Sequence, residues 1–212
     1  MFYREAGDFS TTYREDSQTF PIKFDRYRYY AVLLIAFAII PFLLNDYWVN
    51  AIFLPFLIYS IAAIGLNILT GYCGQVSLGT GGFMAVGAYA TYKLMTAFPE
   101  VSMVVHILLA GGITAFVGVL FGLPSLRIKG FYLAVATLAA QFFLVWLFNR
   151  VPWFYNYSAS GQINSPERTL FGIPITGANT EPWAVYLFCL VFVTLSAIIA
   201  RNLTRGAMGR KW

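Results

Sequence analysis

Long stretches of this chain contain no charged residue. From Tyr29 onward, Asp, Glu, Lys and Arg are absent from five windows, at residues 29–45, 47–92, 101–126, 130–149 and 182–200. A helix needs about 20 apolar residues to cross the hydrocarbon core of a bilayer, so the second window is long enough for two crossings. The windows therefore predict an all-α, polytopic membrane protein with about six transmembrane helices.

The overall composition supports a lipid environment. Hydrophobic types make up 59% of the 212 residues and charged types 11%, whereas soluble domains are about 45–50% apolar and about 25% charged. The net charge of +5 comes from basic residues in loops and tails, so we expect no nucleic-acid partner. The two cysteines, Cys73 and Cys189, have no metal-binding or redox spacing and are interpreted as packing residues.

The boundaries of the expected helices follow from turn residues that flank the apolar windows. The expected ranges are 29–45, 49–70, 83–98, 103–123, 131–148 and 183–200, with a long Asn-, Ser-, Gly- and Pro-rich loop at 149–182. Asn45 to Trp48 is expected to form a short turn. Gly118 and Gly122 have the small-xxx-small spacing that suits close helix contact.

The positions of the basic residues predict the orientation. Residues 1–28, the loop 124–130 and the tail 201–212 together carry 11 of the 14 basic residues. These three segments lie on one side of a six-helix arrangement. By the positive-inside rule that side is cytoplasmic. We therefore expect a cytoplasmic N-terminal tail at 1–28, a membrane domain at 29–200 and a cytoplasmic segment from 201.

Residues that could carry catalysis or bind a metal are scarce. His106 is the only histidine, and no Ser/His/Asp set, HExxH sequence or P-loop is present. We expect no enzyme activity and no metal site, and His106 is interpreted mainly as a packing residue. No Asp or Glu lies within an expected helix, which disfavours proton coupling through this chain.

The segment from Gly71 to Gly82 breaks the helical pattern, with five glycines in twelve residues. Unwound backbone at membrane depth occurs where it is buried in protein or lines a watery cavity. The N–H groups and positive dipole end of a broken helix suit a carboxylate, and Gln75, Ser77 and Thr80 add side-chain hydrogen bonding. A plain loop whose glycines permit tight packing is an equally good interpretation.

Polar side chains elsewhere in the helices are candidates for the same solute path. Thr137 and Gln141 are four residues apart and share one helical face. Hydrogen bonding between helices is the competing and favoured interpretation for them. Lys93 either reaches a membrane boundary or lines a cavity. The candidate path residues are Asn67, Gly71, Gly74, Gln75, Ser77, Gly79, Thr80, Thr137 and Gln141.

Two sequence blocks resemble those of a known family. The first is Gly71-Tyr-Cys-Gly-Gln-Val-Ser-Leu-Gly79, continued by Gly82-Phe-Met-Ala-Val-Gly-Ala-Tyr-Ala90. The second is Leu126-Arg-Ile-Lys-Gly-Phe-Tyr-Leu-Ala134, followed by Thr137-Leu138. Both are similar to signatures of bacterial branched-chain amino acid ABC transporter permeases of the LivM type. Members of this family continue beyond the length seen here, so the resemblance implies an N-terminal fragment.

The resemblance implies a permease subunit in the bacterial cytoplasmic membrane. Its implied partners are a second, LivH-like permease subunit, two ATPase subunits that bind ATP and Mg²⁺, and a periplasmic solute-binding protein. No cofactor is expected in this chain. Arg205, Gly209 and Arg210 lie in a stretch similar to the start of the family's cytoplasmic coupling loop. A permease for urea or short amides, a passive channel and a secondary carrier remain alternatives.

Overall fold

The computed structural model divides into two compact units, residues 1–43 and 44–212, which are described separately. It describes residues 11–12, 23–43, 45–125, 131–158, 160, 163–170, 172–177, 180–206 and 209.

The described helix of the first unit is continuous. It comprises α2 (Lys23–Leu34), the π-helical turn η1 (Ile35–Ile39) and α3 (Ile40–Leu43). It begins six residues before the expected start at 29. Its first turns include an ion pair between Arg28 Nη2 and Asp25 Oδ1, which lie 3.7 Å apart. Charged residues limit the apolar part of a helix without ending the helix, which explains the early start.

The second unit opens with another continuous helix. It comprises α4 (Asp46–Trp48), η2 (Val49–Phe53), α5 (Leu54–Asn67) and η3 (Ile68–Tyr72). The expected turn at 45–48 is therefore wrong beyond Asn45, because Asp46 already starts the first helical turn. The helix ends two residues after the expected position, in a π turn where Cys73 N–H donates to the Ile68 carbonyl at 3.2 Å.

Four further helices complete the second unit. They are α6 (Thr80–Ala97), α7 (Met103–Ser125), α8 (Phe131–Arg150) and α9 (Pro182–Arg205). Their positions agree with the expected ranges to within three residues, except that α9 continues five residues past 200. As in the first unit, the charged residues at this end mark the limit of the apolar span and not of the helix.

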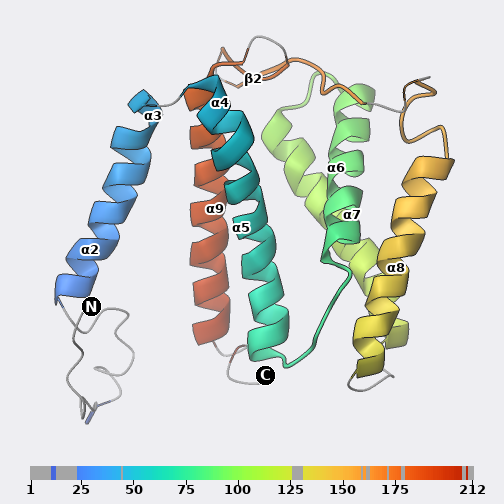
Figure 1. The fold of residues 1–212 in the computed structure, drawn as a ribbon, viewed down its shortest axis with the longest axis horizontal. Helices are drawn as coiled ribbons and strands as arrows, with labels where there is room; N and C mark the ends of the chain where they lie inside the picture. Colours follow the sequence, from blue (N-terminus) through green and yellow to red (C-terminus); the bar gives the residue numbers. More distant parts are fainter. Residues whose placement is uncertain are drawn as a thin grey trace. The chain divides into compact units, whose positions relative to one another are not determined.

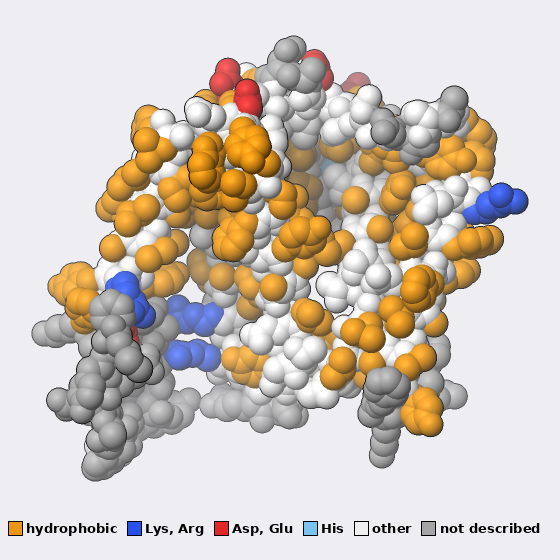
Figure 2. Space-filling model, in the orientation of Figure 1, with side chains coloured by type: hydrophobic (Ala, Val, Ile, Leu, Met, Phe, Trp, Pro, Cys, Tyr) orange, Lys and Arg blue, Asp and Glu red, His pale blue; other side chains and the backbone are white. Residues whose placement is uncertain are grey.

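Five of the described helices are long and apolar enough to cross a membrane. They span Phe24–Leu43, Asp46–Tyr72, Met103–Leu123, Tyr132–Arg150 and Pro182–Arg205. Helix α6 falls outside this group because glycines, threonines and Lys93 lower its hydropathy. Hydrophobic side chains cover the visible sides of the helices (Figure 2). Large exposed residues such as Leu108 and Phe142, 65% and 66% exposed, are consistent with lipid contact.

The helices of the second unit pack in two groups (Figure 1). Helix α9 lies along α5, and the ring of the buried Tyr186 meets Phe53 edge-on with centroids 5.4 Å apart. Helix α6 packs against α7 and α8, where Val86, Leu144 and Phe148 form a buried cluster. Tyr89 stacks on Phe148 at 4.4 Å between centroids. These contacts hold α6 firmly to α8, which matters for the site.

The expected long loop between α8 and α9 contains a small hairpin. Strand β1 (Arg168–Leu170) pairs antiparallel with β2 (Ile173–Thr176). The guanidinium of Arg168 donates to the carbonyls of Met95 and Pro99 at the end of α6. A cation there satisfies carbonyls that the helix leaves unpaired and complements the helix dipole. The hairpin is thereby tied to the α6 end of the unit.

Candidate functional site at the helix break

The predicted break is present between η3 and α6. Residues 73–79 are non-helical, Gly74 has a φ of +64°, and Gln75 N–H donates to the Leu69 carbonyl at 3.0 Å. Glycine adopts this left-handed conformation without steric penalty. Figure 1 shows the green coil rising from the end of α5 alongside the bundle before α6 begins.

The end of this segment that leads into α6 lies very close to helix α8. A Cβ built on Gly79 would lie 2.7 Å from the Thr137 carbonyl oxygen, and one on Gly82 would lie 3.0 Å from the Gln141 Cα. Thr137 is the seventh residue of α8, so this contact lies about 9 Å along the helix. The unwound backbone therefore lies beside a candidate membrane span and not beyond its end.

Side chains pair some of the N–H groups that the unwound segment exposes. The Thr137 hydroxyl accepts from Leu78 N–H at 3.1 Å and donates to the Ala134 carbonyl at 2.8 Å. The Ser77 hydroxyl accepts from Gly79 N–H at 3.4 Å. Backbone at membrane depth needs such partners because hydrocarbon offers none. Thr137 thus bonds the unwound segment, whereas the competing interpretation expected a bond to another helix.

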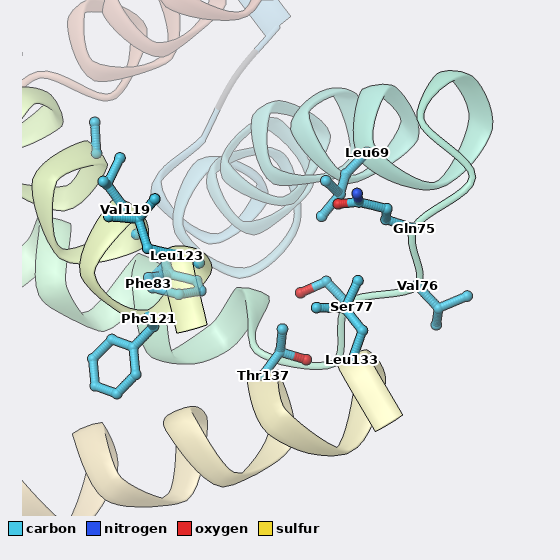
Figure 3. A pocket seen from close by; sticks show the side chains of 13 residues that line it. Leu69, Gln75, Val76, Ser77, Phe83, Val119, Phe121, Leu123, Leu133 and Thr137 are labelled. Carbon is cyan, nitrogen blue, oxygen red and sulfur yellow. The ribbon is translucent and has the colours of Figure 1, made fainter. Parts of the chain in front are cut away.

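Two cavities flank the unwound segment. One, of about 350 Å³, lies between the segment, α7 and α8, and the other, of about 640 Å³, lies between α5, α6 and α7. Leu69, Ser77 and Phe83 line both cavities. None of the described residues that line them is charged. In Figure 3, Gln75 and Ser77 point toward the side where Leu69 and Phe83 lie, and Val76 points the other way.

The structure brings six of the nine candidate path residues together. Gln75, Ser77 and Thr137 line the smaller cavity, and Thr80 lines the larger one with Ser77. Gly79 approaches Thr137, and Gln141 lies against Gly82 at the start of α6. The other three, Asn67, Gly71 and Gly74, are exposed near the end of η3 and line neither cavity.

The cavity walls include residues that the sequence patterns did not identify. Leu69, Phe83 and Leu133 supply apolar surface, and Gly118 and Gly122 on α7 face the smaller cavity. Among the described residues, a Cβ on either glycine would meet no atom within 4 Å, so no close helix contact forms at these glycines within the described part of the chain. Small-residue spacing predicts that helices can approach closely, but it does not say which pair of helices will do so.

His106 lies apart from this site, near the start of α7. Its side chain is 1% exposed, and neither ring nitrogen has a hydrogen-bond partner among the described residues. Among all the described residues, no group of three or more His, Cys, Asp or Glu side chains could hold a metal ion. The chemistry that the break can offer is therefore hydrogen bonding and apolar contact.

Substitution of Gly79 by alanine tests the close contact with α8. The added methyl group would collide with the Thr137 carbonyl, and overpacking of this kind costs about 1–3 kcal/mol. We expect Gly79→Ala to lower the melting temperature of the purified protein. Gly112→Ala on α7, where a Cβ meets nothing within 4 Å, is the matched control and should leave it unchanged or raise it. Equal melting temperatures for the two variants would contradict the contact.

Comparison with known proteins places this geometry in context. Residues 49–212 match the family described as branched-chain amino acid transport system / permease component. Two similar proteins are the LivM proteins of Salmonella typhimurium strain LT2 and Escherichia coli strain K12, both described as high-affinity branched-chain amino acid transport system permease proteins. No solved structure matches this chain significantly.

The similarity to these two relatives is extensive but covers only part of them. Each is 32% identical over an aligned length of 176 residues, and the match covers 74% of this chain and 41% of the relative. This chain therefore matches well under half the length of either protein.

Proposed function

Because this chain belongs to the permease-component family of branched-chain amino acid transport systems, we propose that it is a transmembrane subunit of an ATP-driven importer for these amino acids. The chain is a multi-pass membrane protein, with five described helices apolar enough to span a bilayer. The solute path would run past the unwound segment 73–79.

One observation carries this proposal beyond family membership. Non-helical backbone lies beside α8 within the span of the bundle and separates two uncharged cavities. Backbone of this kind is tolerated at membrane depth where it is enclosed by protein or lines a water-filled space. Ser77 lines both cavities, and Val76 and Leu78 are 55% and 49% exposed, so the segment fits the second of these situations and not full enclosure by protein.

The chemistry of the segment suits an amino acid with an aliphatic side chain. The start of α6 at Thr80 presents N–H groups and the positive end of a helix dipole, which favour a carboxylate. Gln75 and Ser77 offer further hydrogen bonds, and Leu69 and Phe83 offer apolar contact. These walls favour an aliphatic solute over urea or a short amide, which would bury less apolar surface.

Transport by this route would use alternating access. Closure of the partner ATPase subunits on ATP would move the helices around the break, and this chain would bind neither ATP nor Mg²⁺. Because none of the described residues that line the two cavities is charged, they would bind the solute weakly enough to release it on the other side of the membrane. A passive channel or secondary carrier is less favoured, because the family consists of components of transport systems.

The charge distribution within the second unit supports the proposed orientation. Asp46, Glu100, Glu167 and Glu181 all lie at the end that carries the hairpin, where Figure 2 shows acidic side chains gathered. Arg201 and Arg205 lie at the opposite end of α9. Lys93, Arg150 and Arg168 belong to the hairpin end, whereas the sequence adds Arg127 and Lys129 between α7 and α8, and Arg210 and Lys211 after α9. With these residues counted, the positive-inside rule makes the end with Arg201 and Arg205 cytoplasmic. We accordingly propose a bacterial inner-membrane location with a cytoplasmic tail at 1–28 and a permease domain at 29–200.

Residues 201–212 would begin the region that couples to an ATPase subunit. Arg205 closes α9, and a Cβ on Gly209 would collide with the Thr204 carbonyl, so the chain folds tightly against the helix end there. Arg210 lies outside the described residues. The partners in this arrangement would be a second permease subunit, two ATPase subunits and a periplasmic binding protein.

The direct test is uptake by the assembled system. We expect cells that express this permease with its partner subunits to accumulate radiolabelled leucine, isoleucine or valine in an ATP-dependent manner. Removal of the ATPase subunits should abolish uptake. Uptake that persists at the same rate without them would exclude an ATP-driven importer and favour a channel or carrier.

The hydroxyl of Thr137 provides a sharper test of the site within that assay. Thr137→Val removes the acceptor for Leu78 N–H, a loss of about 1 kcal/mol that should loosen the unwound segment. We expect slower uptake from protein that still reaches the membrane. Thr194→Val removes a hydroxyl that bonds only within its own helix, to the Val191 carbonyl, and should transport normally. Normal uptake by both variants would show that the Thr137 hydroxyl does not contribute to the solute path.

A further inference from the structure

A third cavity lies apart from the helix break. It has a volume of about 670 Å³, is open on one side, and is lined by α6, α7, α8 and the turn that follows α8. It shares no lining residue with the two cavities beside the break. Its size falls in the range of about 300–1,000 Å³ that holds one small ligand. Among the described residues that line it, Lys93 alone is charged.

The ammonium group of Lys93 is held in place on two sides. It donates a hydrogen bond to the Asn156 side-chain oxygen and lies 4.3 Å from the centroid of the Trp153 ring. Asn156 in turn donates from Nδ2 to the Tyr92 hydroxyl at 2.7 Å. Its own backbone is left-handed, with a φ of 52°, a conformation that asparagine adopts more readily than most residues. The turn therefore positions the amide that holds the lysine.

The charge of Lys93 is not neutralised within the described part of the chain. No Asp or Glu there lies within ion-pair distance of its ammonium group, and none lines the cavity. The ammonium group is partly exposed, and the cation–π contact beside it supplies only part of the attraction that an anion would supply. An anion at this position would complete the site.

The rest of the cavity is suited to hydrocarbon. Ile113, Val117 and Leu147 line it away from the polar group, and aromatic rings of Tyr89 and Phe148 add further apolar surface. Lys93 lies four residues before the end of α6, about 6 Å from it, and Trp153 follows α8 closely. Lysine and tryptophan at such positions are typical of the level of lipid headgroups.

We propose that this cavity binds one anionic phospholipid, with its phosphate on Lys93 and an acyl chain along the apolar wall. A zwitterionic amino acid fits less well, because none of the described residues that line the cavity is an Asp or Glu that could pair with its ammonium group. An amphiphile with a single negative group matches both halves of the cavity. The proposal does not depend on which solute the permease carries.

The test measures lipid binding to the purified protein. In detergent, native mass spectrometry with added dioleoylphosphatidylglycerol or dioleoylphosphatidylcholine should show preferential binding of the anionic lipid. We expect Lys93→Gln to weaken phosphatidylglycerol binding about fivefold, the loss typical for one basic residue at a membrane surface. Phosphatidylcholine, whose phosphate is offset by its choline group, should lose less affinity than phosphatidylglycerol.

Two further variants separate this site from general charge effects. Arg150→Gln removes the same charge at the end of α8, outside the cavity, and should leave the preference intact. Val117→Phe keeps Lys93 but narrows the cavity, and should also weaken binding. Equal losses for Lys93→Gln and Arg150→Gln, or unchanged binding in Val117→Phe, would overturn the proposal. Displacement of the lipid by millimolar inorganic phosphate would assign the site to a free anion instead.

Discussion

Backbone N–H and C=O groups that leave a helix at membrane depth must find partners in the protein, and this requirement shapes the second unit of the chain. The unwound segment 73–79 meets it by lying against α8, where Thr137 accepts a backbone hydrogen bond and the absence of a side chain on Gly79 permits close approach. The buried Val86, Leu144 and Phe148 hold α6 and α8 together around this contact. The position of the break therefore depends on packing as well as on glycine content.

The same arrangement explains why the break is a candidate path. Because the segment is held at one end by α8, it leaves space on both sides, and the two cavities meet at Leu69, Ser77 and Phe83. A helical continuation would fill this space with its own turns. The family assignment supplies the transport function, and the geometry indicates where within the second unit a small solute would pass.

Much of the fold could be predicted from the sequence, since charge-free windows report the apolar spans directly. The predicted helix ends were less accurate where charged residues flank the apolar span. Helix α2 begins at Lys23 and not at 29, and α9 ends at Arg205 and not at 200, because charges end the apolar span but not the helix. Glycine content predicted the break, but it could not distinguish Gly79 and Gly82, which contact α8, from Gly118 and Gly122, which line the smaller cavity. The β1–β2 hairpin and the partners of Lys93 depend on contacts between distant segments, which patterns in a single sequence do not predict.

The central claim is that the unwound segment borders a water-accessible route through the protein. Thiol reactivity tests it most directly, in a background where Cys73 and Cys189 are replaced by alanine. Ser77→Cys should react with a small membrane-impermeant thiosulfonate in the assembled transporter, and leucine should slow the reaction. Phe142→Cys, at an exposed apolar position on α8, should not react. A Ser77→Cys variant as unreactive as Phe142→Cys would contradict the claim.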